Sequence, residues 1–325
     1  MQPLFSPPWW GSNPHLQTIL PVLTKIAKVT LQRERVELED GDFIDLDWLS
    51  TPPSGKPLLV LLHGLEGSAD SHYARRMLAA CARQQLAVVV HHHRGCSGEP
   101  NRLNRSYHSG DTGDIGHTLK LLRQRYPQSP LLAVGYSLGG NVLAKYQGEQ
   151  GNASLLSRAA VVSAPLELAG CSRKLERGFS RLYQRYLLRQ LQQKMQAKIA
   201  LSPLPVQQDG NSIRRLNTFY KFDDQLTGPM HGFAGADDYY RRASALPLID
   251  HITRPTLFIH AADDPFMSHS VIPDTTSLPT CVQYELYPHG GHVGFIDGGT
   301  PWRPQYFLER RLLQYLLEDE NAGTL

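Results

Sequence analysis

The sequence predicts an α/β fold, with a mostly parallel central sheet and helices on both of its faces. Short, continuous apolar runs recur along the chain, which is typical of strands buried on both faces of a sheet. Segments with helical periodicity separate several of these runs, and strand–helix alternation builds parallel sheets with right-handed crossovers. Of the 325 residues, 41% are hydrophobic and 19% charged, so the composition is that of an ordinary globular protein.

The N-terminal part of the chain contains two different patterns. Residues 1–30 combine apolar and proline-rich pieces, from which we expect an irregular arm. Residues 31–49 alternate between apolar and polar side chains on either side of Asp40 and Gly41. An Asp-Gly pair between alternating segments signals a tight turn, so this stretch predicts a β-hairpin.

The core of the expected fold follows the hairpin. Five apolar runs are expected to be strands: residues 58–64, 87–95, 131–137, 159–165 and 256–264. Helical segments lie between several of them, at residues 72–85, 111–126 and 138–149. A last strand, VQYELY, and a helix near residues 304–319 close the chain. We therefore expect a single α/β domain over residues 1–325.

The strand–helix alternation breaks at residues 167–250. This stretch is arginine-rich, helical in its first part and loop-rich around residues 203–211, and we interpret it as a helical lid or cap inserted into the domain. Four apolar residues recur there at helical spacing and are expected to form the buried stripe of a helix: Leu175, Phe179, Leu182 and Tyr186.

The inserted stretch is also strongly basic. Residues 172–198 carry eight lysines or arginines and a single acid, Glu176. The simplest interpretation is a solvated basic face, and the functional alternative is contact with an anionic lipid surface or an acidic substrate. The basic residues are Arg173, Lys174, Arg177, Arg181, Arg185, Arg189, Lys194 and Lys198.

A candidate nucleophile lies in the middle of the chain. Residues 135–139, GYSLG, match the pattern G-x-S-x-G, directly after the apolar run LLAV and at the start of a helical segment. A nucleophile elbow requires this strand–turn–helix setting, with small residues two positions before and after the serine. The helix N-terminus behind the serine favours negative charge. Ser137 is therefore the candidate nucleophile of an α/β-hydrolase fold.

A serine nucleophile needs a general base, and in this fold the acid and then the histidine follow the serine in the chain. His292 lies in a glycine-flanked loop, GGHVGF, after the last expected strand, and we favour it over His289. Asp263 and Asp264 both end the strand TLFIHA. We favour Asp264 as the acid that orients the imidazole, because an Asp-Pro pair before an aromatic residue suits this turn, and Asp263 remains the alternative.

The loop HGLEG, after the first core strand, is the candidate oxyanion hole. Its place in the fold brings backbone N–H groups near the serine, so Leu65 N–H and Leu138 N–H are the candidate donors. His63 is expected to order this loop rather than to act as a base. Residues 91–93 are all histidines, but neighbours on a strand point to alternate faces, so they do not predict a metal site.

Several function classes are excluded by composition. The four cysteines are far apart and form no C-x-x-C pair, which argues against a disulfide framework and favours a reducing, cytoplasmic compartment. A formal net charge of +3 is too small to indicate nucleic-acid binding. The N-terminus lacks a signal-peptide pattern, and no apolar run predicts a transmembrane helix. Nothing in the sequence implies a cofactor.

Taken together, the motifs resemble a known family. HGLEG, HHHRGCSG, GYSLGGN, AADDPF and GGHVGF, with SNPHLQT near the start, are similar to those of the bacterial YheT-type α/β-hydrolases. These in turn resemble the eukaryotic ABHD1/2/3 group and the yeast ethyl-ester synthases. The resemblance covers nearly the whole chain and is weakest over residues 167–250. It implies a carboxylic-ester hydrolase with Ser137, Asp264 and His292 as its triad, among relatives that act on acyl lipids or medium-chain esters.

The expected function is therefore the cleavage of carboxylic esters, with short, medium or lipid acyl chains, through an acyl-enzyme on Ser137. An acyltransferase that uses an alcohol or thiol as acceptor, or a thioesterase, would employ the same triad and remains an alternative. A non-enzymatic member of the fold would be expected to lack part of the triad, and here all three residues are in place.

Overall fold

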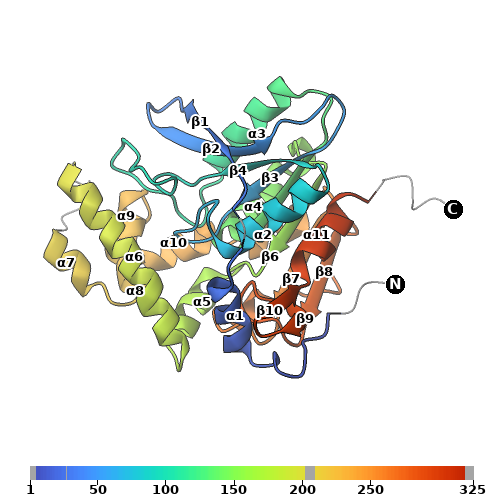
Figure 1. The fold of residues 1–325 in the computed structure, drawn as a ribbon. Helices are drawn as coiled ribbons and strands as arrows, with labels where there is room; N and C mark the ends of the chain where they lie inside the picture. The colour runs from blue at the N-terminus through green and yellow to red at the C-terminus, as the bar shows by residue number, and fades with distance from the viewer. Residues whose placement is uncertain (1–4, 27, 202–208, 319–325) are drawn as a thin grey trace.

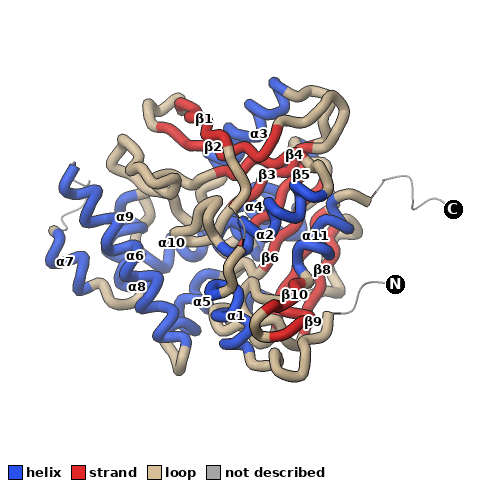
Figure 2. The backbone as a smooth tube through the Cα atoms, viewed as in Figure 1, coloured by secondary structure: helices blue, strands red, loops and turns tan. Residues whose placement is uncertain are grey.

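The computed structural model describes residues 5–26, 28–201 and 209–318. Figures 1 and 2 show a central sheet with helices packed around it and a group of helices to one side. The described ranges contain ten strands: β1 (Gln32–Glu37), β2 (Phe43–Ser50), β3 (Leu58–Leu62), β4 (Ala87–His91), β5 (Leu131–Tyr136), β6 (Arg158–Val162), β7 (Thr256–Ala261), β8 (Val282–Tyr287), β9 (Ile296–Thr300) and β10 (Arg303–Tyr306).

The predicted α/β-hydrolase fold is confirmed by the main sheet. Its eight strands run in the order β1-β2-β4-β3-β5-β6-β7-β8. The six strands from β4 to β8 pair in parallel, while the β1–β2 hairpin joins them antiparallel at one edge. The hairpin prediction is confirmed as well, since Val36 pairs with Ile44 across a turn in which Gly41 takes a positive φ.

Helices cover both faces of this sheet, as the apolar runs predicted. One core cluster joins the sheet to α3 (Gly113–Arg125) and α4 (Leu138–Gln150). A second cluster, on the other face, joins it to α2 (His72–Arg83) and α11 (Leu308–Leu316). Because the central strands are buried on both faces, every residue of β3, β4 and β5 is buried.

The expectation of an irregular N-terminal arm is wrong, because a helix, α1 (Pro14–Leu23), forms there. The Asn13 side chain caps it by accepting the N–H groups of His15 and Leu16. Pro14 occupies the first turn, where its missing N–H costs nothing. The prolines of this segment suggested irregular structure, although Asn13 and Pro14 form an ordinary helix N-terminus.

The C-terminal end also differs from the prediction. Between β8 and the last helix, β9 and β10 form a separate antiparallel pair. The closing helix therefore begins at Leu308, later than the expected residue 304. These two strands are short, and residues 296–306 contain two glycines and two prolines. Such a segment lacks the alternation of apolar and polar residues by which a strand is predicted.

Helices fill most of the described chain between β6 and β7. They are α5 (Leu168–Leu175), α6 (Ser180–Leu201), α7 (Gly210–Arg215), α8 (Phe219–Phe222), α9 (Gly228–Met230) and α10 (Ala236–Ala243), with a π-helical turn at Asp223–Thr227. The second half is thus more helical than expected. Of the stretch expected to be loop-rich, residues 203–211, residues 203–208 lie outside the described residues. The expectation is wrong for Gly210 and Asn211, which begin α7 after the capping residue Asp209.

The expected buried stripe of this insertion is wrong for three of its four residues. Gly178, with a φ of 51°, separates α5 from α6, so the four residues do not share one helix. Leu175 is buried, but Phe179, Leu182 and Tyr186 are exposed. The opposite face of α6 carries the buried residues Leu188, Leu191 and Met195, which pack in a small core of the insertion.

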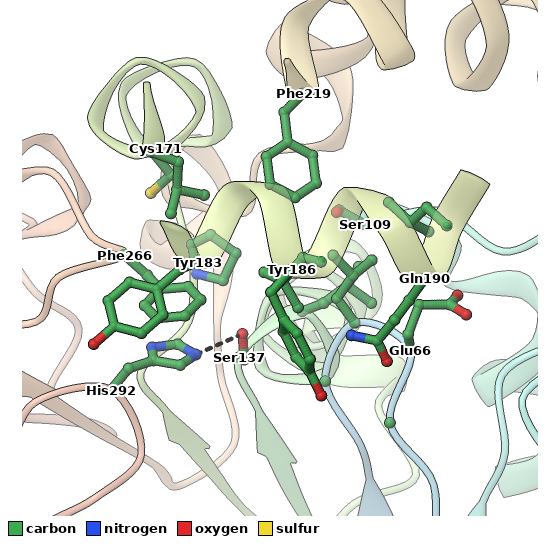
Figure 3. Close-up of a pocket in the computed structure, with 18 of the residues that line it drawn as sticks. Glu66, Ser109, Ser137, Cys171, Tyr183, Tyr186, Gln190, Phe219, Phe266 and His292 are labelled. Atoms are coloured by element: carbon green, nitrogen blue, oxygen red, sulfur yellow. Dashed lines mark hydrogen bonds between the residues drawn. The ribbon is translucent and has the colours of Figure 1, made fainter. Parts of the chain in front are cut away.

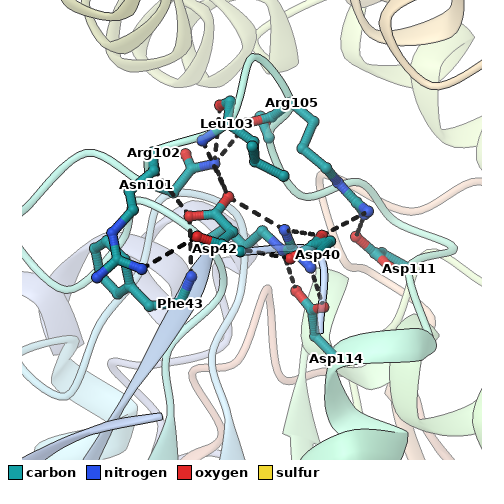
Figure 4. A network of polar contacts seen from close by, with 12 residues as sticks. Asp40, Asp42, Phe43, Asn101, Arg102, Leu103, Arg105, Asp111 and Asp114 are labelled. Carbon is teal, nitrogen blue, oxygen red and sulfur yellow. Dashed lines mark hydrogen bonds and ion pairs between the residues drawn. The ribbon is translucent and has the colours of Figure 1, made fainter. Parts of the chain in front are cut away.

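A buried charge network fixes the hairpin edge of the sheet (Figure 4). The Arg94 guanidinium donates two hydrogen bonds of 2.7 Å to Asp114 at the start of α3. It also reaches Asp40 at 2.7 Å and Asp42 at 3.2 Å in the β1–β2 turn. The network therefore joins the hairpin turn, the loop after β4 and α3 through a single side chain.

Candidate active site

Ser137 lies on a sharp turn between β5 and α4. Its backbone takes a φ of 51° and a ψ of −121°, a conformation that non-glycine residues rarely adopt. The Ser137 N–H donates to the Val162 carbonyl at the end of β6, at 2.8 Å. The turn therefore holds the hydroxyl above the carboxyl edge of two neighbouring parallel strands, where ligand sites of open α/β sheets lie.

Two glycines make this turn possible. A Cβ on Gly135 would overlap the backbone of Gly139, and one on Gly139 would overlap the His63 carbonyl at the end of β3. Each site leaves room only for hydrogen, which explains the small residues two positions from the serine.

The structure brings Ser137, His292 and Asp264 together. The His292 Nε2 lies 3.1 Å from the Ser137 Oγ, and its Nδ1 lies 2.9 Å from the Asp264 Oδ2. Asp264 is buried and also accepts the Phe266 N–H at 2.8 Å. The Phe266 ring stacks on the imidazole with 4.1 Å between centroids. Both ring nitrogens of His292 therefore have hydrogen-bond partners, and Phe266 packs against one face of the ring.

The alternatives Asp263 and His289 form a different pair. The Asp263 carboxylate lies 3.2 Å from the His289 Nδ1 and accepts the Gly291 N–H at 3.0 Å. His289 is exposed. Burial raises the pKa of Asp263, against the opposing hydrogen bonds from Gly291 and His289. Asp263 therefore supports the backbone of the histidine loop and does not contact the imidazole that reaches Ser137.

The helix α1 supports the same loop from the other side. The His292 N–H donates to the Thr18 hydroxyl at 3.0 Å. The Gln17 side chain, fully buried, donates to the Ile296 carbonyl and accepts the Ile296 N–H. Gly294 passes so close to the Gln17 carbonyl that any Cβ would collide with it. These residues were missed in the sequence, although Asn13 before Pro14 is a helix-start signal that would have located α1.

The two expected oxyanion donors belong to segments that meet at Ser137. Leu138 begins α4, and the HGLEG loop approaches from β3 so closely that a Cβ on Gly64 would lie 3.1 Å from the Ser137 Cβ. Within the described ranges, neither the Leu65 N–H nor the Leu138 N–H donates to a protein acceptor. Both donors are therefore available to a ligand beside the hydroxyl.

A partly buried ion pair joins this loop to the helical insertion. Glu66 has a φ of 50°, and its N–H donates to the Tyr107 hydroxyl at 2.8 Å. That hydroxyl donates in turn to the Glu66 Oε1, which also receives the Lys194 Nζ of α6 at 3.0 Å. Lys194 further contacts the Cys96 sulfur at 2.9 Å. Sequence reasoning treated Lys194 as part of a basic face and did not foresee this contact.

The remaining histidines near the site have structural partners. His63 accepts the His93 N–H at Nε2 and lies 2.8 Å from the Gly64 carbonyl through Nδ1. Burial, together with the neighbouring histidines, lowers the pKa of His63 well below its ordinary value. His91, His92 and His93 contact Thr118, Asp47 and the His63 carbonyl respectively. Their rings therefore do not converge on one point.

A cavity of about 650 Å³ opens above Ser137 and His292. Figure 3 shows the serine hydroxyl and the imidazole facing one another within the lining side chains. Apolar residues of the insertion and of the loop after β7 make up much of its wall: Leu168, Leu175, Leu187, Leu191, Met195, Phe222, Phe266 and Met267. Such a cavity favours an apolar ligand with its reactive group at the serine.

Known proteins resemble this chain over most of its length. Residues 57–299 match the family described as alpha/beta hydrolase fold. The YheT protein of Escherichia coli (strain K12) is 49% identical over 311 residues, which cover 94% of this chain and 90% of that protein. Human phospholipase ABHD3 is 29% identical over 322 residues, or 96% of this chain and 78% of that protein.

More distant similarities agree on the fold. The monoacylglycerol lipase of Saccharomyces cerevisiae is 30% identical over 259 residues, covering 76% of this chain and 57% of that protein. The solved structure of a Pyrococcus furiosus esterase superposes with a TM-score of 0.54 at 14% identity, over 90% of this chain and 91% of that one. Among the described helices, none combines the length and the apolar character needed to cross a membrane.

Proposed function

Because the chain belongs to the α/β-hydrolase family, among its esterases and lipases, we propose that it cleaves carboxylic esters through an acyl-enzyme on Ser137. The observation that carries this proposal is the chain of two contacts, Ser137 to His292 to Asp264, at 3.1 and 2.9 Å. A hydroxyl, an imidazole and a buried carboxylate in this order form an activated serine nucleophile.

The proposed first half of the reaction forms the acyl-enzyme. Asp264 accepts a hydrogen bond from the His292 Nδ1–H and leaves the proton on the ring, so the Nε2 lone pair faces the Ser137 hydroxyl. As the Ser137 Oγ attacks the ester carbonyl, its proton moves to the Nε2. The carbonyl oxygen becomes an oxyanion beside the Leu65 and Leu138 N–H groups, which are our candidate donors. The imidazolium then protonates the leaving alcohol.

The second half regenerates the enzyme. Water attacks the acyl-enzyme carbonyl and gives one proton to the His292 Nε2. The tetrahedral intermediate collapses, the acid leaves, and the proton returns to the Ser137 Oγ. If an alcohol or thiol takes the place of water, the same steps transfer the acyl group instead of hydrolysing it.

The proposed substrates are esters with an apolar acyl chain of medium length or longer. The largely apolar wall of the cavity supports this substrate class. The names of the relatives, a phospholipase and a monoacylglycerol lipase, agree with it. We further propose that the helices between β6 and β7, residues 167–250, act as a cap that shapes the acyl-binding part of the cavity within a single domain.

A chain-length series of p-nitrophenyl esters tests this proposal. We expect the wild-type protein to cleave them with a higher kcat/KM for medium acyl chains than for acetate, and the Ser137→Ala variant to show only the background rate. Added alcohol in the same assay measures the share of acyl transfer. Equal rates for wild type and Ser137→Ala would rule the proposal out.

A further inference from the structure

Apolar side chains gather on one exposed face of the molecule. Six of the ten large hydrophobic residues that the described chain exposes lie on α1 and at the start of α6. We call this surface the α1–α6 face, defined by Ile19, Val22, Leu23, Phe179, Leu182 and Tyr186. Single exposed apolar residues are normal, but a contiguous group of them marks a binding surface.

The two helices form one surface. The His15 Nδ1 of α1 lies 3.0 Å from the Tyr183 hydroxyl of α6, and its ring lies 4.3 Å from the Phe179 ring. Figures 1 and 2 show α1 next to the N-terminal end of α6, away from the β1–β2 hairpin. The apolar residues of α6 face outward because the helix buries its opposite side, Leu188 and Leu191, in the insertion core.

Part of this face continues into the cavity that contains Ser137. Ile19, Val22, Leu23 and Tyr186 line the cavity and are exposed at the same time. The exposed fraction of Leu23 is 71% and that of Tyr186 is 65%, so these residues form a rim rather than a closed wall. An acyl chain entering along this rim would stay in contact with apolar surface up to the serine.

Positive charge borders the apolar rim. Arg181, Arg185 and Arg189 follow one another at four-residue intervals beside Leu182 and Tyr186 on α6, and all three are exposed. Arg33 and other arginines of this protein pair with carboxylates, whereas these three have no carboxylate partner among the described residues. An apolar face with an unneutralised basic border is the pattern of a helix that lies in a lipid–water interface.

We propose that the α1–α6 face docks on a lipid surface that carries anionic headgroups, and that ester substrates enter the cavity directly from that surface. The proposal deepens, and in its substrate-entry part rests on, the proposed ester hydrolysis. Apolar side chains enter the acyl boundary, and the arginines contact headgroup phosphates. A second copy of the chain fits this face less well, because symmetric pairing would bring the arginine rows of both copies together.

Vesicle binding of the Ser137→Ala protein tests the proposal without consuming lipid. We expect it to sediment with vesicles of phosphatidylcholine and phosphatidylglycerol, and more weakly with phosphatidylcholine alone. Phe179→Ser with Leu182→Ser is expected to weaken partition about tenfold or more. At roughly fivefold per charge, Arg181→Gln with Arg185→Gln is expected to weaken it by about 25-fold.

A matched control removes one apolar and one basic residue elsewhere. Trp302 and Arg83 are exposed and line a different depression, which lacks Ser137. Trp302→Ser with Arg83→Gln is expected to leave vesicle binding unchanged. In the Ser137-containing protein, none of the three paired variants should change the cleavage of a water-soluble ester, because none of the replaced residues lines the catalytic cavity.

The outcomes separate the two proposals. No vesicle binding, binding that the α1–α6 variants leave unchanged, or a dimer that only these variants dissociate would overturn lipid docking. Vesicle binding that depends on the α1–α6 face would support it even if ester cleavage were absent, and that absence would count against the proposed hydrolysis alone.

Discussion

At the scale of single residues, two adjacent carboxylates at the end of β7 have different partners. Asp264 is buried against His292, while Asp263 contacts the exposed His289 and the Gly291 N–H. The sequence predicted a carboxylate at this position, because an apolar strand pattern followed by an Asp-Pro turn is recognisable in it. The sequence could not show whether Asp263 or Asp264 contacts His292. That depends on how the loop around residue 292 folds against the end of β7.

This difference predicts unequal effects of two conservative substitutions. We expect Asp264→Asn to lower kcat by roughly 10³- to 10⁴-fold, because the amide no longer favours the reactive tautomer of His292 or stabilises its imidazolium. Asp263→Asn is expected to stay within about tenfold of wild type, since it disturbs only the Gly291 backbone and the exposed His289, neither of which contacts Ser137. Steady-state kinetics on a soluble ester measure both, and a reversed order would refute the assignment.

A second residue-scale prediction concerns Asp223, a carboxyl in the cavity wall. Burial raises its pKa from 3.8 to about 7, although hydrogen bonds from Thr227 and Tyr240 oppose the shift. The folded protein then binds the proton more tightly than the unfolded chain, so this group makes stability fall as the pH rises from about 4 to 7.

Asp223→Asn removes that pH dependence and retains an oxygen that accepts the 2.8 Å hydrogen bond from the Tyr240 hydroxyl. We expect the free energy of unfolding of the variant, relative to wild type, to rise by about 2 to 4 kcal/mol across this window. Urea titrations at several pH values between about 4 and about 8 provide the measurement. A difference that is independent of pH would contradict the raised pKa.

At the scale of elements, helices that the sequence concealed support the site. The helix α1 holds the His292 loop through Thr18 and Gln17, yet its prolines made the segment look irregular. In α6, helical spacing alone did not reveal which side faces the core. The residues 179, 182 and 186 and the residues 188, 191 and 195 both fit a helical stripe, and only the position of the insertion core decides between them.

The helix α6 also contacts the HGLEG loop, the candidate oxyanion hole, through Lys194. We expect Lys194→Met to lower kcat by about tenfold or more with little change in KM, because Glu66 loses its counter-ion and the loop that carries the Leu65 N–H loosens. A hydrophobic replacement also leaves the partly buried Glu66 carboxylate without its cation, so the free energy of unfolding should fall.

Lys198→Met is the matched control on α6. Lys198 is buried whereas Lys194 is partly buried, and the Lys198 ammonium contacts the Asn101 side chain and carbonyl, away from the HGLEG loop. It should reduce stability with kcat unchanged, measured on the same soluble ester. Equal losses of kcat in both variants would mean that Lys194 acts only by anchoring the helix.

At the scale of the whole molecule, the sheet brings distant segments to one edge. Ser137 follows β5, Asp264 follows β7 and His292 follows β8, and these strands run parallel in one sheet. The apolar runs and their alternation with helical segments predicted this parallel sheet. The small β9–β10 pair and the arrangement of the insertion were not predictable, because they depend on contacts between segments with little periodicity of their own.

The Arg94 network holds the antiparallel edge of that sheet to the rest of the fold. Burial raises the pKa of Asp114, but the hydrogen bonds from Arg94 outweigh it, and the net pKa is lowered. Arg94→Met is expected to cost about 3 to 5 kcal/mol of unfolding free energy near neutral pH, because Asp114 and Asp42 remain buried without their cation.

The pH dependence of this cost follows from the direction of the shift. The lowered pKa of Asp114 contributes stability above its ordinary pKa, and that contribution disappears as the pH falls through the folded-state value. The difference in unfolding free energy between wild type and Arg94→Met should therefore become smaller at acidic pH, and urea titrations measure it. Adding Asp114→Asn to the Arg94→Met variant should restore part of the lost unfolding free energy. No restoration would argue against an unpaired buried carboxylate as the cause.

The most direct test of the account is covalent labelling of the serine by a fluorophosphonate probe, followed by mass spectrometry of the labelled peptide. An activated hydroxyl in this setting predicts a single modified residue, Ser137, and a large drop in labelling rate for His292→Ala. Labelling of any other residue, or a rate that is the same without the His292 imidazole, would contradict the claim that these side chains act together.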